Sequence, residues 1–200
     1  MIKVIFFILL LIQTTNQAHP VTWKSGSVSS FRSTNSIKEL KIHYSVSSRY
    51  AFGFHGVTLF DKSYIMAQQN LLINRVNSKH SQSNIYYFFG LGSNVGSDTI
   101  LHQGLQADWE TQSLYTQLNI DSYFKRNTVA HFRYRFGFAP YVVGYYDLQP
   151  WIIAQLNSIY TNGNFSNTLM PVIRLFGNNL LVEFGYNLNQ DYMATIMHHF

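Results

Sequence analysis

The chain contains no cysteine, few charged residues and no long apolar run, and each shortage removes a class of protein. Without cysteine there is neither a disulfide framework nor a thiolate metal cluster. Charged residues make up only 12% of the sequence, whereas a soluble surface carries about 25–35%. After the first few residues, no window approaches about 18 consecutive apolar residues, so no transmembrane helix is expected. What remains is a chain of 200 residues that is 46% hydrophobic and 16% aromatic, the size of about one domain.

The first 18 residues have the order of a secretory signal peptide. Lys3 gives a positive start, residues 4–12 form an unbroken apolar run, and a polar stretch ends at the small residue Ala18. The apolar run is too short to cross a bilayer by itself. We therefore expect cleavage after Ala18 and a single β-barrel domain over residues 19–200. The remaining excess of basic residues is small and not grouped into a patch, so no nucleic-acid partner is expected.

Apolar and polar residues alternate from about Glu39 to the end of the chain. Residues 129–139 show this most clearly: one face of a strand there would be apolar and largely aromatic, and the other mainly cationic, because strand side chains switch faces at each residue. The apolar face comprises Ala130, Phe132, Tyr134, Phe136 and Phe138, and the opposite face comprises His131, Arg133, Arg135 and Gly137.

Turn signals such as Asn162-Gly163 divide the sequence into about twelve strands, with ten as the alternative. The predicted strands are 27–33, 39–47, 49–60, 64–74, 84–92, 102–111, 114–124, 129–139, 151–160, 169–175, 180–188 and 192–200. Two all-β folds fit the pattern, a secreted soluble β-sandwich and a closed antiparallel transmembrane β-barrel. Scarce charge and aromatic-rich faces favour the barrel, which turns apolar residues toward lipid and encloses polar ones. Closure is needed because an open sheet edge in lipid leaves unpaired backbone groups.

The last strand, YMATIMHHF over residues 192–200, has Tyr192, Ile196 and the terminal Phe200 at alternate positions. It resembles the C-terminal insertion signal of Gram-negative outer-membrane β-barrels, although His198 departs from the pattern. The resemblance implies export, insertion by the barrel assembly machinery, and contact with lipid in the bacterial outer membrane.

Three further stretches, AHPVTWK (18–24), GLQADWE (104–110) and RFGFAPY (135–141), are similar to a family of small outer-membrane proteins. Members of that family are often encoded near heavy-metal efflux systems. The resemblance implies a link to metal handling, and it brings no catalytic residues with it.

Inward-facing polar residues on three consecutive strands form a predicted lumen cluster, comprising Asp108, Glu110, Asp121, His131, Arg133 and Arg135. We expect the acids and arginines to pair across neighbouring strands and to fill a narrow barrel. A selectivity lining, or a general acid/base pair formed by Asp108 and Glu110, is the functional alternative.

Two groups could bind a metal ion. Met193, Met197 and His199 share one face of the last strand, and thioether and imidazole ligands suit copper or silver. After cleavage, His19 would offer an α-amine and an imidazole, while Pro20 has no N–H to contribute. At least one more histidine would be needed there, with His43, His55, His80 and His102 as the open choices.

No motif for a nucleophilic triad or a phosphate loop is present, so we expect no enzyme and no cofactor beyond a possible copper or silver ion. The predicted role is a monomeric outer-membrane barrel, either structural, ligand-binding or a narrow passage for small solutes or ions, with both termini periplasmic. A lipid-modifying enzyme is the alternative function.

Overall fold

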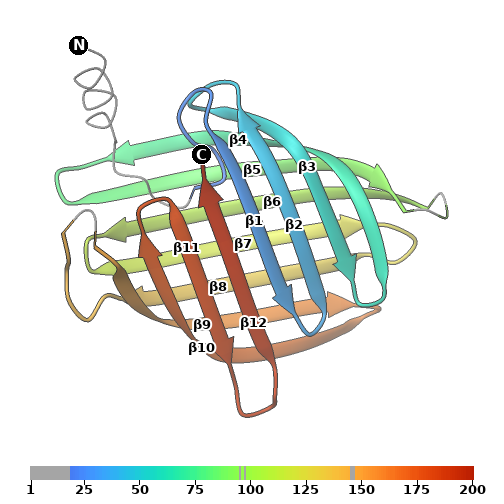
Figure 1. The fold of residues 1–200 in the computed structure, drawn as a ribbon. Helices are drawn as coiled ribbons and strands as arrows, with labels where there is room; N and C mark the ends of the chain where they lie inside the picture. Colours follow the sequence, from blue (N-terminus) through green and yellow to red (C-terminus); the bar gives the residue numbers. More distant parts are fainter. Residues whose placement is uncertain (1–18, 95, 97, 145–146) are drawn as a thin grey trace.

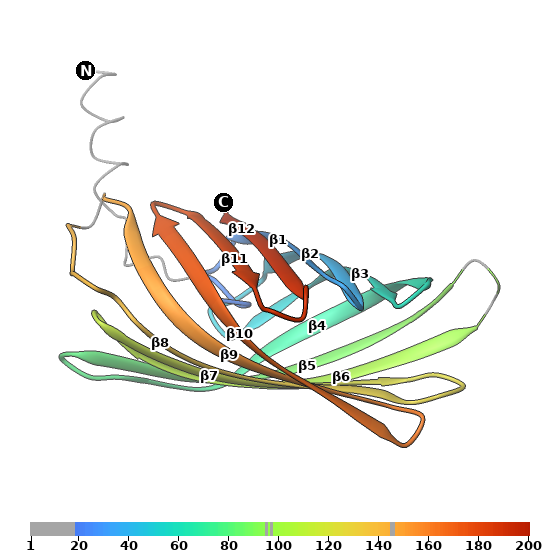
Figure 2. The same ribbon diagram turned by 90° about the horizontal axis from the view of Figure 1, so that it is seen from below.

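The computed structural model describes residues 19–94, 96, 98–144 and 147–200, and in this part of the chain twelve strands form one closed antiparallel barrel. Each strand pairs with its neighbours in the sequence, and β1 pairs with β12 to close the ring (Figures 1 and 2). The expected signal peptide lies outside the described residues. No helix in the described part is long and apolar enough to cross a membrane. The strands are β1 (Ser27–Thr34), β2 (Ile37–Ser45), β3 (Tyr50–Leu59), β4 (Lys62–Asn77), β5 (Ser81–Ser93), β6 (Thr99–Thr111), β7 (Leu114–Phe124), β8 (Val129–Phe138), β9 (Gln149–Thr161), β10 (Asn164–Gly177), β11 (Leu180–Tyr186) and β12 (Tyr192–His199).

The closed barrel of about twelve strands is confirmed, and ten strands and the soluble sandwich are wrong. Some strands extend beyond the predicted ranges, notably β4 and β10. Their ends are polar, so hydrophobic alternation fades there, yet backbone pairing continues to the hairpins, as in Asn77 with Gln82 and Asn164 with Thr161. Hydrogen bonding along the ladder therefore sets these strand ends where side-chain pattern does not.

An even number of strands brings both ends of the barrel sequence to one rim. The backbone of Ser27 exchanges hydrogen bonds of 3.1 and 2.9 Å with Phe200. We call this rim, with the β2–β3, β4–β5, β6–β7, β8–β9 and β10–β11 connections, the terminal mouth, and the other rim the opposite mouth. At the opposite mouth the predicted turn between β9 and β10 has positive φ at Asn162 (52°) and Gly163 (85°), the conformation of a type I′ hairpin.

Apolar side chains cover the outside of the barrel. Phe54 is 66% exposed, whereas its neighbour His55 is 0% exposed and points inward. On β8, the predicted aromatic face made by Phe132, Tyr134, Phe136 and Phe138 is likewise exposed. An outer surface of this kind suits hydrocarbon rather than water.

The interior is more mixed than alternation predicted, because it encloses large apolar side chains as well as polar ones. One apolar cluster lies where β2, β4, β6 and β8 begin and where β3 and β7 end, which is at the opposite mouth. It comprises Ile37, Val57, Leu59, Tyr64, Met66, Ile100, Tyr123 and Val129, and we call it the apolar layer. A narrow barrel is filled by side chains, so inward positions without a polar partner are occupied by packed apolar groups.

Candidate functional site

The barrel interior holds a cavity of about 140 Å³, room for roughly ten water molecules. Strands from all around the barrel contribute to its wall, and the His19–Pro20 segment covers part of it. Five basic and five acidic residues line the cavity, so their formal charges cancel. They are Arg32, Lys41, Arg133, Arg135, Arg174, Glu39, Asp108, Glu110, Asp121 and Glu183.

Glu39 on β2 is the centre of the first charged group. Its carboxylate is buried and pairs with the Arg32 guanidinium on the neighbouring strand and with Lys41 Nζ at 3.3 Å. His55 Nε2 lies 3.2 Å from the same carboxylate, and the Tyr123 hydroxyl donates a hydrogen bond to it at 2.9 Å. These contacts compensate the cost of burying the carboxylate and link β1, β2, β3 and β7 through the interior.

Glu183 on β11 is the centre of a second group. Its Oε1 accepts hydrogen bonds from Arg135 Nη2 at 2.8 Å and from Arg174 Nε at 2.7 Å. The Arg174 guanidinium also lies 4.2 Å from the centre of the Tyr115 ring, within cation–π range. Because Arg135 is on β8 and Glu183 on β11, this pair crosses the lumen instead of joining adjacent strands.

Asp121 and His102 form a third, smaller group. His102 Nε2 lies 2.9 Å from Asp121 Oδ1, and the histidine ring stacks on Tyr123 with centroids 4.7 Å apart. Tyr123 belongs to the apolar layer and also bonds to Glu39, so it joins this group to the first one.

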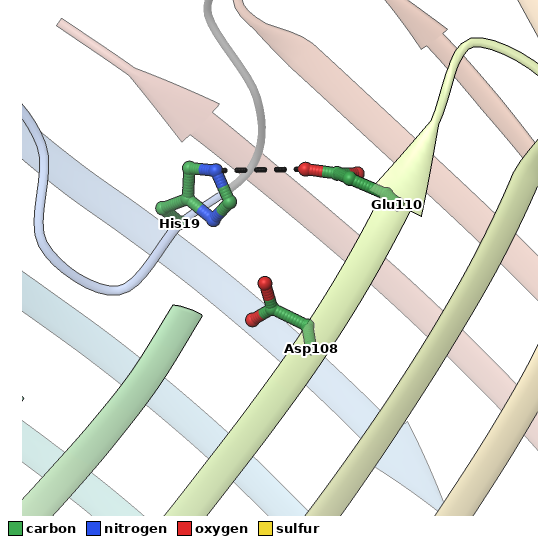
Figure 3. A group of neighbouring side chains, drawn as sticks. All are labelled: His19, Asp108 and Glu110. Carbon is green, nitrogen blue, oxygen red and sulfur yellow. Dashed lines mark ion pairs between the residues drawn. The ribbon is translucent and has the colours of Figure 1, made fainter. Parts of the chain in front are cut away.

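Asp108 and Glu110 lie on the inner face of β6, next to His19. Asp108 accepts hydrogen bonds from Asn84 Nδ2 at 2.7 Å and from Gln106 Nε2 at 2.8 Å. Glu110 Oε1 lies 3.7 Å from His19 Nε2, and Figure 3 shows both carboxylates directed toward the histidine ring. Burial, together with the nearby positive charge of Arg75, lowers the pKa of His19 to about 3, so its imidazole is neutral at physiological pH.

The segment that carries His19 folds into the terminal mouth. Val21 is buried against Ala51, Leu72, Tyr86 and Phe88, and the Thr22 amide donates a hydrogen bond to Ser45 Oγ at 3.0 Å. These contacts hold residues 19–26 against the inner wall. Sequence alternation gave no indication of this, because the segment belongs to no strand.

All six residues of the predicted lumen cluster point inward, and all except His131 line the cavity. The predicted pairing of these acids with arginines across β6, β7 and β8 is wrong, however, although acid–arginine pairs do join β1 to β2 and β10 to β11. The register places Gln117 opposite Arg135 and Asn119 opposite Arg133, so the arginines face amides on β7. Asp121 lies opposite His131, whose Nε2 contacts Asn157 Oδ1 at 3.4 Å.

Arg133 differs from the other lumenal arginines. Within the described part of the chain it has no ion pair, and its Nε is buried without a hydrogen-bond partner. Asn119 stands opposite it and donates its own hydrogen bond to Gln106 Oε1 at 3.0 Å. Arg133 therefore presents an uncompensated positive charge to the cavity.

The predicted soft-metal ligands Met193, Met197 and His199 do share the inner face of β12. Met193 is packed in an apolar cluster and its Sδ accepts a hydrogen bond from Gln155 Nε2 at 3.4 Å, whereas Met197 lines the cavity. Binding of copper or silver at these residues stays a prediction. The group of potential ligands around His19 contains Asp108 and Glu110, not the second histidine that the sequence left open.

Residues of the predicted insertion signal, Tyr192, Ile196 and Phe200, are exposed at the outer surface. The ring of His198 packs edge-on against Phe200 with centroids 4.2 Å apart, which accommodates a polar residue on this face. Recognition of this strand by an assembly machinery stays a prediction.

Sequence reasoning missed Glu39, Arg32, Arg174 and Glu183, which form lumenal ion pairs between neighbouring strands. A signal existed for two of them. Arg174 is the single charged residue within 169–175, and Glu183 is the single charged residue within 180–188. A lone charge in an otherwise apolar strand of a membrane barrel marks an inward position that needs a partner.

No protein-family model matches the chain, and no curated protein matches its sequence. Its fold is similar to two solved structures. One is described as KdgM porin, with a TM-score of 0.53 and 14% identity over 88% of this chain and 98% of that one. The other, KdgM porin in complex with disordered oligogalacturonate, gives a TM-score of 0.56 and 14% identity over 88% of this chain and 99% of that one. At this identity the likeness shows the fold alone, which in this chain is a closed twelve-stranded antiparallel β-barrel.

Proposed function

We propose that the protein is an outer-membrane β-barrel that provides a narrow, gated passage for small polar solutes or ions. The observation that carries this proposal is a cavity of about 140 Å³, lined by charged residues and enclosed by a barrel with an apolar outer surface. The fold shared with KdgM porin supports a channel rather than an enzyme.

The cavity is narrow because both of its ends are occupied by protein. Residues 19–26 are packed at the terminal mouth, and the apolar layer fills the interior near the opposite mouth. Apolar constrictions gate pores by excluding water. Passage would therefore require both of these elements to move, which favours a small and regulated flux.

The charge of the lumen also argues for small solutes. One of the similar porins holds oligogalacturonate, an acidic sugar polymer. In this chain the five basic residues of the cavity are balanced by five acidic residues, and several of these charged side chains pair with one another. Such a lining gives a long polyanion little net attraction, whereas small solutes and ions can pass between fixed opposite charges.

Conductance in planar lipid bilayers tests the proposal. Purified barrel should give stepwise currents, and Arg133→Gln should shift the reversal potential in a salt gradient toward cation preference, because it leaves the lining with one net negative charge. Lys38→Gln is the matched control, since Lys38 is an exposed residue on the outer face of β2. Absence of any conductance, or equal shifts in the two variants, would contradict a channel role.

Outer-membrane location is part of the same proposal and has its own test. The protein should fractionate with outer membranes and migrate differently on gels when unheated. Removal of Phe200 should lower the amount inserted if the terminal residue is read by the assembly machinery. Equal insertion without Phe200 would argue against that signal.

A further inference from the structure

Three side chains from two separate parts of the chain converge inside the terminal mouth: His19, Asp108 and Glu110. The position of His19 is set on both sides, because its own Nε2 contacts Gln82 Oε1 at 2.9 Å and the following Pro20 carbonyl accepts a hydrogen bond from Asn70 at 3.1 Å. The burial of Val21 fixes the segment further. These contacts fix the position of His19 in the wall of the terminal mouth.

Potential ligand atoms of the three residues all lie within 4.8 Å of one another. Asp108 and Glu110 are two positions apart on β6, which places both carboxylates on its inner face. An ion bound at about 2.0–2.2 Å from each ligand keeps its ligands within roughly 4.4 Å of each other. Small side-chain rotations would thus bring the three groups around one ion (Figure 3).

These two carboxylates differ from the other lumenal acids in how they are compensated. Glu39 and Glu183 pair with arginines, but in the described chain neither Asp108 nor Glu110 pairs with lysine or arginine. Glu110 Oε1 is buried and has no hydrogen-bond partner. Two adjacent buried carboxylates repel each other, and a cation between them would remove that repulsion.

The donor set indicates the class of ion. One imidazole and two carboxylates suit zinc and similar divalent transition metals, whereas calcium takes six to eight oxygen ligands and copper(I) or silver prefers sulfur. When Nε2 donates its hydrogen to Gln82, Nδ1 is the unprotonated ring nitrogen, and metal-ligating histidines are commonly oriented by such a hydrogen bond. The hydrogen bonds from Asn84 and Gln106 orient Asp108 in the same manner.

We propose that His19, Asp108 and Glu110 bind a divalent transition-metal ion of the zinc class. The ion joins the segment 19–26 to β6 and so holds this segment across the terminal mouth. The site stands independently of the channel proposal, because it is measured by binding and not by conductance.

Isothermal titration of ZnCl₂ into the purified, folded barrel without a polyhistidine tag tests this site. We expect one saturable zinc ion per chain and a loss of affinity of tenfold or more in His19→Ala and in Glu110→Gln. His43→Ala is the matched control, because His43 also lines the cavity but lies outside the group, and it should keep the wild-type affinity. The mobility of unheated protein on gels verifies that each variant is folded.

Cobalt(II) provides a second measurement, because its visible absorption reports the ligand set directly. The wild-type spectrum should change in His19→Ala and should not change in His43→Ala. No saturable zinc binding, zinc binding that survives His19→Ala, or binding of silver but not zinc would overturn the proposal.

Discussion

Replacing Glu183 by glutamine should destabilise the barrel strongly. The carboxylate of Glu183 is buried and is the shared partner of Arg135 and Arg174, with contacts of 2.8 and 2.7 Å. Glutamine keeps the size of the side chain but removes its negative charge. Two guanidinium groups would then remain inside the barrel with one neutral oxygen between them.

The magnitude follows from the cost of leaving a buried charge without its partner, which is about 3–5 kcal/mol. The cation–π contact of Arg174 with Tyr115 offsets part of this cost for one guanidinium, by about 2 kcal/mol in a desolvated site. Arg135 lies farther from the centre of the same ring, at 5.9 Å, so its cation–π stabilisation is weaker. Subtracting this offset leaves an expected net loss of about 1–3 kcal/mol in the free energy of unfolding.

Urea titration of the detergent-folded protein, followed by tryptophan fluorescence, measures this loss. With a slope of about 2 kcal/mol per M, the midpoint should fall by about 0.5–1.5 M. Asp98→Asn is the control, because Asp98 pairs with Lys62 at 3.8 Å where both side chains are more than half exposed, and such pairs contribute about 0–1 kcal/mol. If Glu183→Gln shifts the midpoint no more than Asp98→Asn does, the Glu183 group is not a stabilising element.

Three further substitutions test the barrel. Gly53→Ala should lower the free energy of unfolding, measured by urea titration, by about 1–3 kcal/mol, because the added Cβ would overlap a backbone carbonyl of the neighbouring strand. Gly56→Ala is the control and should be nearly neutral, because the atom nearest to its added Cβ is 3.9 Å away. Phe136→Arg should lower folding stability in lipid vesicles by about 2–4 kcal/mol if this face meets the bilayer centre, while Tyr141→Arg at the rim should cost about 0–1 kcal/mol; equal effects would argue against the lipid-facing assignment. Val21→Asp should release the segment at the terminal mouth and raise single-channel conductance in planar bilayers, and an unchanged current would show that this segment does not limit the current.

Alternation predicted the fold because it is a local property of each strand. In β8 the two-residue period of a strand is enough to place Phe132 and Phe136 on one face and Arg133 and Arg135 on the other. The small number of charged residues in the sequence then indicated that the apolar face is turned outward, toward lipid. Hydrophobic pattern was a weaker guide to strand ends such as that of β4, because polar residues there carry no alternation.

The lumenal contacts could not be predicted in the same way. Pairing of Arg135 with Glu183 joins β8 to β11, and contacts of this kind depend on the diameter and stagger of the whole barrel. Neighbouring strands could have been aligned, but a shift of one residue exchanges the partners, and the observed register placed amides opposite both arginines. The convergence of His19 with Asp108 required knowing that a segment without strand pattern enters the lumen.

If the barrel is a channel, as proposed, its unpaired charges mark where the interior would interact with solutes. Burying a charge without a partner lowers the stability of a barrel, so pairs such as Arg32 with Glu39 are explained by stability alone. In the described chain Arg133 has no carboxylate partner. The carboxylates of Asp108 and Glu110, beside His19, have no arginine or lysine partner. Arg133 and this pair of carboxylates lie on the wall of the same cavity, and one is positive while the other is negative. A mobile ion or solute is the partner that can compensate each of them in turn, and for this reason variants at these positions should change conduction and metal binding more than they change stability.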